Sequence, residues 1–199
     1  MLRCILIALP LVTSIGCGVT TTAEYHKQYN VHVETSDIEM LDVISNLAVE
    51  FNRESGHDAI RIVDEQQGAN SSIRFVENLL EEKNYLGYGV GLTREVDGDS
   101  AMKGLTTIEN KKHILYAMHL QFDADNFKKH SELALSGSDN AESWDHLYHL
   151  FCHEVGHGML LQHDDSAQSS VMYPVIHKLN RDQIDYQGYF ESIDAFFAE

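Results

Sequence analysis

The residues with the clearest capacity for chemistry lie between positions 153 and 163. His153, Glu154 and His157 occupy one five-residue stretch, and His163 follows six positions after His157. On a helix, residues four apart point the same way, one turn apart, so two of these imidazoles could hold one metal ion. Glu154 would lie close enough to reach a water molecule on that ion without binding the ion itself. This pattern suits zinc.

A zinc site that performs catalysis needs a third protein ligand and an open fourth position. His163 could supply the third imidazole once the helix has ended and the chain has turned back. Three neutral imidazoles leave the ion dipositive, which makes a water molecule on it acidic near neutral pH. Glu154 would take the proton of that water and pass it to a leaving amine. For the five-residue stretch alone, solvated or packed histidines are an equally good interpretation.

The segment 153–174 resembles the metzincin family of zinc peptidases. The histidines and Glu154 match the family's H-E-x-x-H-x-x-G-x-x-H motif, and Met172 matches the methionine of its Met-turn. The sequence Ser170–Pro174 is close to the matrixin version of that turn, and His163–Asp164 is similar to the adamalysin ending. The resemblance implies Zn²⁺ as cofactor, held by His153, His157 and His163, with Glu154 as catalytic base and a protein or peptide as substrate.

The same resemblance implies a fold and a structural role for Met172. The fold is α+β and zincin-like: a twisted mixed sheet, two long helices, and a small C-terminal subdomain (residues 164–199) with the Met-turn and a final helix. Met172 would form an apolar floor beneath the histidines. Asp164 could brace that turn by hydrogen bonding, and a simple surface carboxylate is an equally good interpretation. Leu160 stands where the family has glycine, so we expect either strain at Leu160 or a rearranged turn that uses Gly158.

Hydrophobic periodicity predicts the elements that position these residues. Alternating patterns predict strands at 29–34, 59–63 and 72–76, an edge strand at 85–93 that could pair with an extended substrate, and a hairpin of 103–107 and 113–122 around Glu109–Asn110. Helical spacing predicts a helix over 38–54 after Ser36–Asp37, a helix from Ser143 to 159, and a last helix from Asn180 or Asp182 to 197. We expect a polar loop over 128–142.

The composition and the N-terminal residues limit the partners and the location that we expect for this protein. The chain has 14 Lys+Arg against 31 Asp+Glu, a formal net charge of -17, which argues against nucleic acid as a partner. Residues 1–16 are typical of a signal peptide, and Ser14–Cys17 resembles the lipobox of bacterial lipoproteins. We therefore expect export, a lipid on Cys17 that anchors the protein in a bacterial outer membrane (periplasmic or surface face), a tether over 17–28, and a catalytic domain over 29–199. Simple secretion after cleavage near Ala23 is the alternative.

Four other interpretations stay open at this level. The chain could be a catalytically silent, surface-tethered binding lipoprotein with the same fold, although an intact Glu154 argues against it. Glu191 could replace His163 as third ligand. His146 and His149 could form a second metal site, but exposed or supporting hydrogen-bonding roles suit them better. Asp123 and Asp125 could bind calcium, but two aspartates after a strand more often form a loop.

Overall fold

A mixed β-sheet forms the centre of the protein. The computed structural model describes residues 28–83, 85–95, 105–108, 111–137, 140–176 and 179–198. Six strands of this part of the chain form the sheet, in the order β2-β1-β3-β6-β4, with β5 paired to β6. The strands are β1 (Tyr29–Glu34), β2 (Ile60–Val63), β3 (Ser71–Val76), β4 (Gly87–Glu95), β5 (Leu105–Ile108) and β6 (Lys111–Asp123). The α+β class with a mixed sheet is thereby confirmed.

Strand direction divides the sheet into two parts. β1, β2, β3 and β6 pair in parallel, whereas β4 and β5 run antiparallel to β6. β4 is an edge strand, as its sequence predicted, although it begins at Gly87 and extends to Glu95. β5 and β6 form the predicted hairpin, with Ile108 opposite Lys111; residues 103–104 and 109–110 lie outside the described residues. The open edge on β4 lies next to the helix α5 (Asn140–Gly158).

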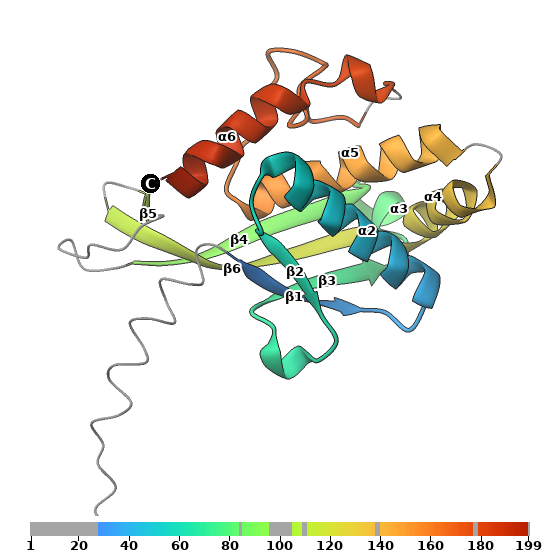
Figure 1. The fold of residues 1–199 in the computed structure, drawn as a ribbon, viewed down its shortest axis with the longest axis horizontal. Helices are drawn as coiled ribbons and strands as arrows, with labels where there is room; N and C mark the ends of the chain where they lie inside the picture. Colours follow the sequence, from blue (N-terminus) through green and yellow to red (C-terminus); the bar gives the residue numbers. More distant parts are fainter. Residues whose placement is uncertain are drawn as a thin grey trace, which may run out of the picture.

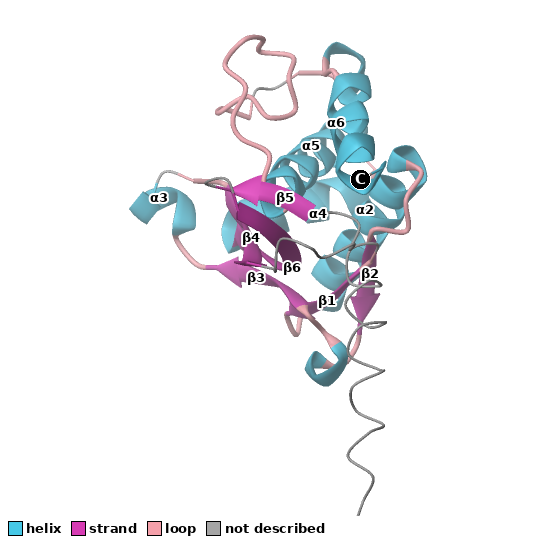
Figure 2. Ribbon diagram, turned by 90° about the vertical axis from the view of Figure 1, so that its left-hand side faces the viewer, coloured by secondary structure: helices cyan, strands magenta, loops and turns pink. Residues whose placement is uncertain are grey.

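Three helices cover one face of the sheet, as Figures 1 and 2 show. α2 (Ile38–Ser55) begins at Asp37, whose carboxylate accepts hydrogen bonds from the backbone N–H groups of Glu39 and Met40. Asp37 is therefore the cap of the predicted helix. α4 (Ala124–Ser136) and α5 (Asn140–Gly158) follow β6. Apolar side chains of these helices and of the sheet face that they cover form one core. Its buried members include Tyr29, Val31, Ile44, Leu47, Phe51, Ile73, Leu115, Met118, Leu120, Phe122, Phe127 and Val155.

The prediction of a polar loop over 128–142 is wrong, because α4 occupies most of that segment. Asp123 caps the helix through a 2.9 Å hydrogen bond from the N–H of Asn126, and Gly137 ends it in a left-handed conformation (φ 82°). Phe127, Ser131 and Ala134 form its buried side. This side is narrow and carries a serine, so the apolar periodicity of the sequence was too weak to indicate a helix.

Two helix starts also differ from prediction. α5 begins at Asn140, and Ser143 is a buried residue of its first turn and not its cap. Near the C-terminus, Asn180 caps a short 3₁₀ turn (Arg181–Gln183), and α6 (Tyr186–Ala198) begins only after it. Asp182 lies within the 3₁₀ turn and caps nothing. The chain therefore forms a separate 3₁₀ turn before its last helix, which the sequence did not predict.

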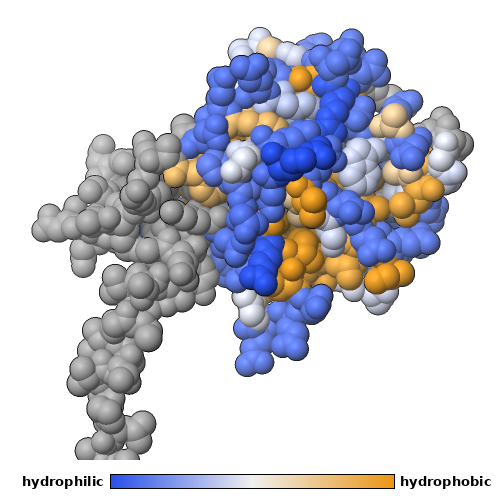
Figure 3. Space-filling model, in the orientation of Figure 1, coloured by the Kyte–Doolittle hydropathy of each residue, from blue (hydrophilic) through white to orange (hydrophobic). Residues whose placement is uncertain are grey.

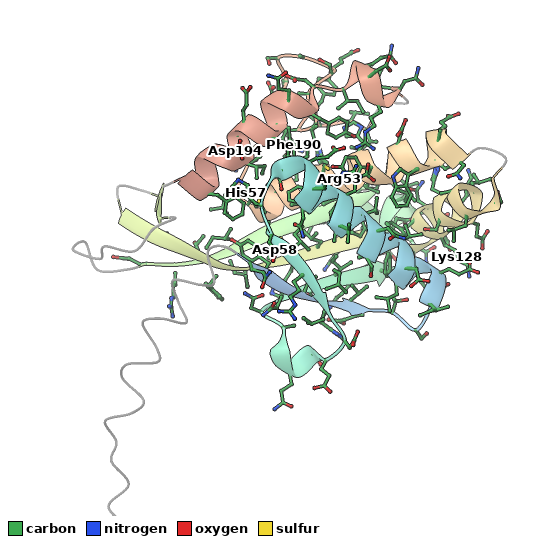
Figure 4. The ribbon with its side chains drawn as sticks, in the orientation of Figure 1. Arg53, His57, Asp58, Lys128, Phe190 and Asp194 are labelled. Atoms are coloured by element: carbon green, nitrogen blue, oxygen red, sulfur yellow. The ribbon has the colours of Figure 1, made fainter. Side chains whose placement is uncertain are left out.

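The last helix packs against α2 and α5. The ring of Phe51 on α2 contacts Tyr189 and Phe190 edge-on, with centroids 6.5 and 5.8 Å apart. Farther along α6, Asp194 points toward His57 in the turn after α2, with His57 Nε2 2.7 Å from Asp194 Oδ1 (Figure 4). α6 is thus held both by aromatic packing and by a polar contact.

The face of the protein drawn in Figure 3 is mainly hydrophilic, with smaller apolar areas between the hydrophilic ones. No helix within the described residues is both long and apolar enough to cross a membrane. The predicted signal peptide, Cys17 and nearly all of the tether lie outside those residues.

Candidate metal centre

Three imidazoles converge at the C-terminal end of α5. One nitrogen from each of His153, His157 and His163 lies within 4.8 Å of the other two, and this is the one group of three or more candidate metal ligands in the described part of the chain. His157 Nε2 is 3.0 Å from His163 Nε2. His153 and His157 come from successive turns of α5, and His163 comes from the segment that follows. The structure therefore brings together all three of the predicted ligands.

Backbone carbonyl groups orient the two helical imidazoles. His153 Nδ1 lies 2.8 Å from the carbonyl oxygen of Val171, and His157 Nδ1 lies 2.9 Å from that of Leu161. A carbonyl oxygen can only accept, so each Nδ1 carries the proton and each Nε2 keeps its lone pair for a metal ion. The sequence did not predict these two carbonyl partners, because every residue has a backbone carbonyl group and its residue type does not show which one accepts.

The turn that delivers His163 uses a left-handed leucine. Leu160 has φ 69°, its N–H donates to the His157 carbonyl, and the N–H of Leu161 donates to the Gly156 carbonyl, both at 2.9 Å. This pair of hydrogen bonds is a Schellman ending of α5. A non-glycine residue in that conformation costs about 1–2 kcal/mol. The strain expected at Leu160 is therefore present, and the alternative turn through Gly158 is not used.

Met172 lies beneath the histidine helix. It is buried, and a Cβ atom at Gly156 would come within 2.4 Å of its sulfur. Glycine at 156, between the two helical histidines, is what allows this close approach. Next to it, Asp164 donates its N–H to the Met172 carbonyl at 2.9 Å. The Asp164 carboxylate accepts from Ser166, and this hydrogen bonding lowers its pKa. Asp164 thus braces the turn.

Glu154 lies in the seam between α5 and the edge strand. It is 4% exposed, and burial raises its pKa from 4.5 to about 8. A Cβ atom at Gly87 of β4 would lie 2.5 Å from Glu154 Oε1, so only glycine leaves room for the carboxylate. Burial likewise lowers the pKa of His153 to about 4 and lowers that of His157. The site therefore favours the neutral form of the two helical imidazoles, beside a carboxyl group that resists ionisation.

A cleft of about 590 Å³ opens over these residues. Its floor carries the three histidines and Glu154. One wall comes from Leu80 and residues 85–89, in β4 and the segment before it, and the other from Pro174, Val175 and Ile176, which follow Met172. Apart from the floor, every lining side chain is uncharged. Such a cleft admits an extended chain with apolar side chains to the histidine cluster.

The segment that forms the second wall is anchored by Arg181. Its guanidinium pairs with Glu50 at 2.7 Å and with Glu54 at 2.5 Å on α2, and it lies 4.3 Å from the centre of the Tyr148 ring on α5. Burial disfavours the Arg181 charge, but the two carboxylates outweigh it and raise its pKa. The chain is thus held by buried Met172 before this wall and by the Arg181 cluster after it.

The remaining candidate residues lie elsewhere. Glu191 is exposed on α6 and accepts from Gln187 at 3.0 Å, so it is not a third ligand. His146 and His149 are not in the histidine cluster; His149 is 2% exposed, which corrects its expected place on the helix surface, and His146 Nε2 lies 3.4 Å from Asn126 Oδ1.

The calcium interpretation of Asp123 and Asp125 finds no support in the geometry. Asp123 is 4% exposed and uses both carboxylate oxygens as acceptors for backbone N–H groups, while Asp125 is exposed in the first turn of α4. Neither belongs to a converging group of acidic ligands among the described residues.

Comparison with known proteins adds no assignment. No family model matches the chain, and no curated protein matches it significantly.

Proposed function

We propose that this protein is a zinc-dependent endopeptidase of the metzincin type. The observation that carries the proposal is the convergence of His153, His157 and His163 beside buried Glu154 on the floor of an open cleft. Chance clusters of histidine are common on surfaces, but here two rings are held by backbone carbonyls with their Nε2 atoms turned to a shared point.

The donor set fits zinc. Metal binding requires neutral imidazole, and burial lowers the pKa of both helical histidines, so they are neutral at physiological pH. Three imidazoles with a position open to the cleft are a common ligand set of catalytic zinc. Zinc bound there would polarise a substrate carbonyl and acidify a water molecule.

Glu154 is placed to move protons. A dipositive ion close by favours the charged carboxylate and offsets the effect of burial on the pKa. Glu154 would then accept a proton from the attacking water and deliver it to the nitrogen of the leaving amine. Because the carboxylate lies between α5 and Gly87 of the edge strand, it faces the place where a strand-like substrate would lie.

The arrangement of elements supports the metzincin assignment. A mixed sheet with an antiparallel edge strand, two long helices α2 and α5, a buried methionine below the histidines and a final helix α6 follow one another in the expected order. The free side of β4 could bind an extended peptide by main-chain hydrogen bonds. The accompanying proposal of export and a lipid on Cys17 rests on the sequence of residues 1–17 alone.

The test is cleavage of an unstructured protein by the purified domain loaded with zinc. Wild type should cleave it, Glu154→Gln should retain zinc but lose at least 100-fold in rate, as expected for removal of a general base, and Glu132→Gln on the exposed side of α4 should match wild type. Zinc binding without cleavage of any protein offered would instead favour the silent binding lipoprotein.

A further inference from the structure

The connection between β3 and β4 begins and ends next to one residue. It leaves β3 after Val76, which is paired with Asp123, and it enters β4 at Gly87, which is paired with Phe122. Asp123, the last residue of β6, therefore lies at the base of this connection, residues 77–86, between its two ends.

Asp123 holds both halves of the connection through hydrogen bonds. Its N–H donates to the carbonyl of Leu86 at 2.9 Å, and its carboxylate Oδ2 accepts from the N–H of Leu80 at 2.8 Å. The other carboxylate oxygen caps α4 through Asn126 at 2.9 Å. One buried side chain thus ties the connection to the start of the helix that precedes α5.

The connection supplies a wall of the cleft. Leu80, Tyr85 and Leu86 line it, yet Leu80 is 40% exposed and Tyr85 55% exposed. Burial in the core therefore does not fix these two side chains. Leu79 is the buried anchor of this segment, and the Asp123 hydrogen bonds hold the backbone that follows it, at Leu80 and at Leu86.

We propose that Asp123 is a positioning residue for substrate binding: it sets the place of the wall formed by Leu80, Tyr85 and Leu86. This inference rests on the proposed peptidase function for its substrate, and on the hydrogen bonds alone for its structural part. Asp123 does not touch the substrate or the histidines, so it acts on substrate affinity and not on the proton transfers of Glu154.

Asp123→Asn separates the two tasks of the carboxylate. Asparagine caps helices as well as aspartate does, so its amide oxygen can still accept from Asn126. Its NH₂ group would then face the N–H of Leu80, which loses its acceptor. Asp125→Asn makes the same change in charge at an exposed position in the first turn of α4 and is the matched control.

Two measurements decide the proposal. Hydrogen exchange followed by mass spectrometry should show faster exchange over 79–86 in Asp123→Asn, with α4 unchanged. In cleavage of a peptide with large apolar side chains, KM should rise about tenfold, which corresponds to the loss of one hydrogen bond, while kcat and zinc content stay within twofold of wild type. Asp125→Asn should match wild type in both.

Unchanged exchange over 79–86 would overturn the inference. A lower kcat and zinc content with unchanged KM would also overturn it, because that pattern indicates loss of folded enzyme. If wild type cleaves nothing, the proposed function fails and the substrate role of the wall fails with it, while the exchange data still decide whether Asp123 holds the connection.

Discussion

Replacement of Glu154 by glutamine should change how the stability of the metal-free protein depends on pH. Burial raises the pKa of this carboxyl group from 4.5 to about 8, so over this interval the folded protein keeps a proton that the unfolded chain releases. The free energy of unfolding must therefore fall as pH rises from about 4.5 to 8. The shift corresponds to about 5 kcal/mol in total, of which roughly 2 kcal/mol falls between pH 6.5 and 8.

The interval above pH 6.5 isolates this carboxyl group from the neighbouring imidazoles. The pKa values of His153 and His157 are lowered in the folded state, so their contribution to stability is lost only as pH falls below 6.5. Urea unfolding of metal-free wild type should therefore show a decline of about 2 kcal/mol between pH 6.5 and 8 relative to Glu154→Gln. Glu132→Gln should follow wild type. Parallel profiles for wild type and Glu154→Gln would refute the reasoning.

Two further predictions concern the surroundings of the site. Gly87→Ala places a methyl group 2.5 Å from Glu154 Oε1, so it should reduce the cleavage rate at least tenfold without loss of zinc. Gly68→Ala, where a Cβ meets nothing within 4 Å, should leave the cleavage rate unchanged. Equal cleavage rates for the two variants would contradict the contact between Gly87 and Glu154. Arg181→Met removes the nearest cation from Glu50 and Glu54 on α2 and should lower the free energy of unfolding by about 2 kcal/mol in urea titrations. Arg53→Met removes an exposed cation that lies 3.5 Å from the same carboxylates and should change it by less than about 0.5 kcal/mol. Equal losses would show that the cluster around Arg181 adds no stability.

Much of the fold could be predicted because its elements have strong periodic signals. β1 begins and ends where the alternation does, and α2 follows from its cap and its apolar positions. α4 could not be predicted as easily, because its buried side consists of Phe127, Ser131 and Ala134. The sequence did contain one usable signal, the aspartate at the end of β6 followed by a possible helix turn, but an aspartate after a strand is equally typical of a loop.

The convergence of the three histidines could be predicted because it follows from residue type and spacing. The three histidines and Met172 lie where helical geometry and the family resemblance placed them. The groups that orient them could not be predicted in the same way. The carbonyls of Val171 and Leu161 are backbone atoms, and the room that Gly87 leaves for Glu154 depends on how β4 packs against α5. Such contacts are set by tertiary structure.

The account depends most directly on one claim: the three histidines hold a single zinc ion, and Glu154 performs the proton transfers of peptide hydrolysis there. The decisive measurement is zinc content per chain and cleavage of an unstructured protein, made on the same samples of wild type and Glu154→Ala. The account predicts one zinc per chain in both and cleavage by wild type alone. Wild type without zinc, or equal cleavage by both proteins, would contradict it.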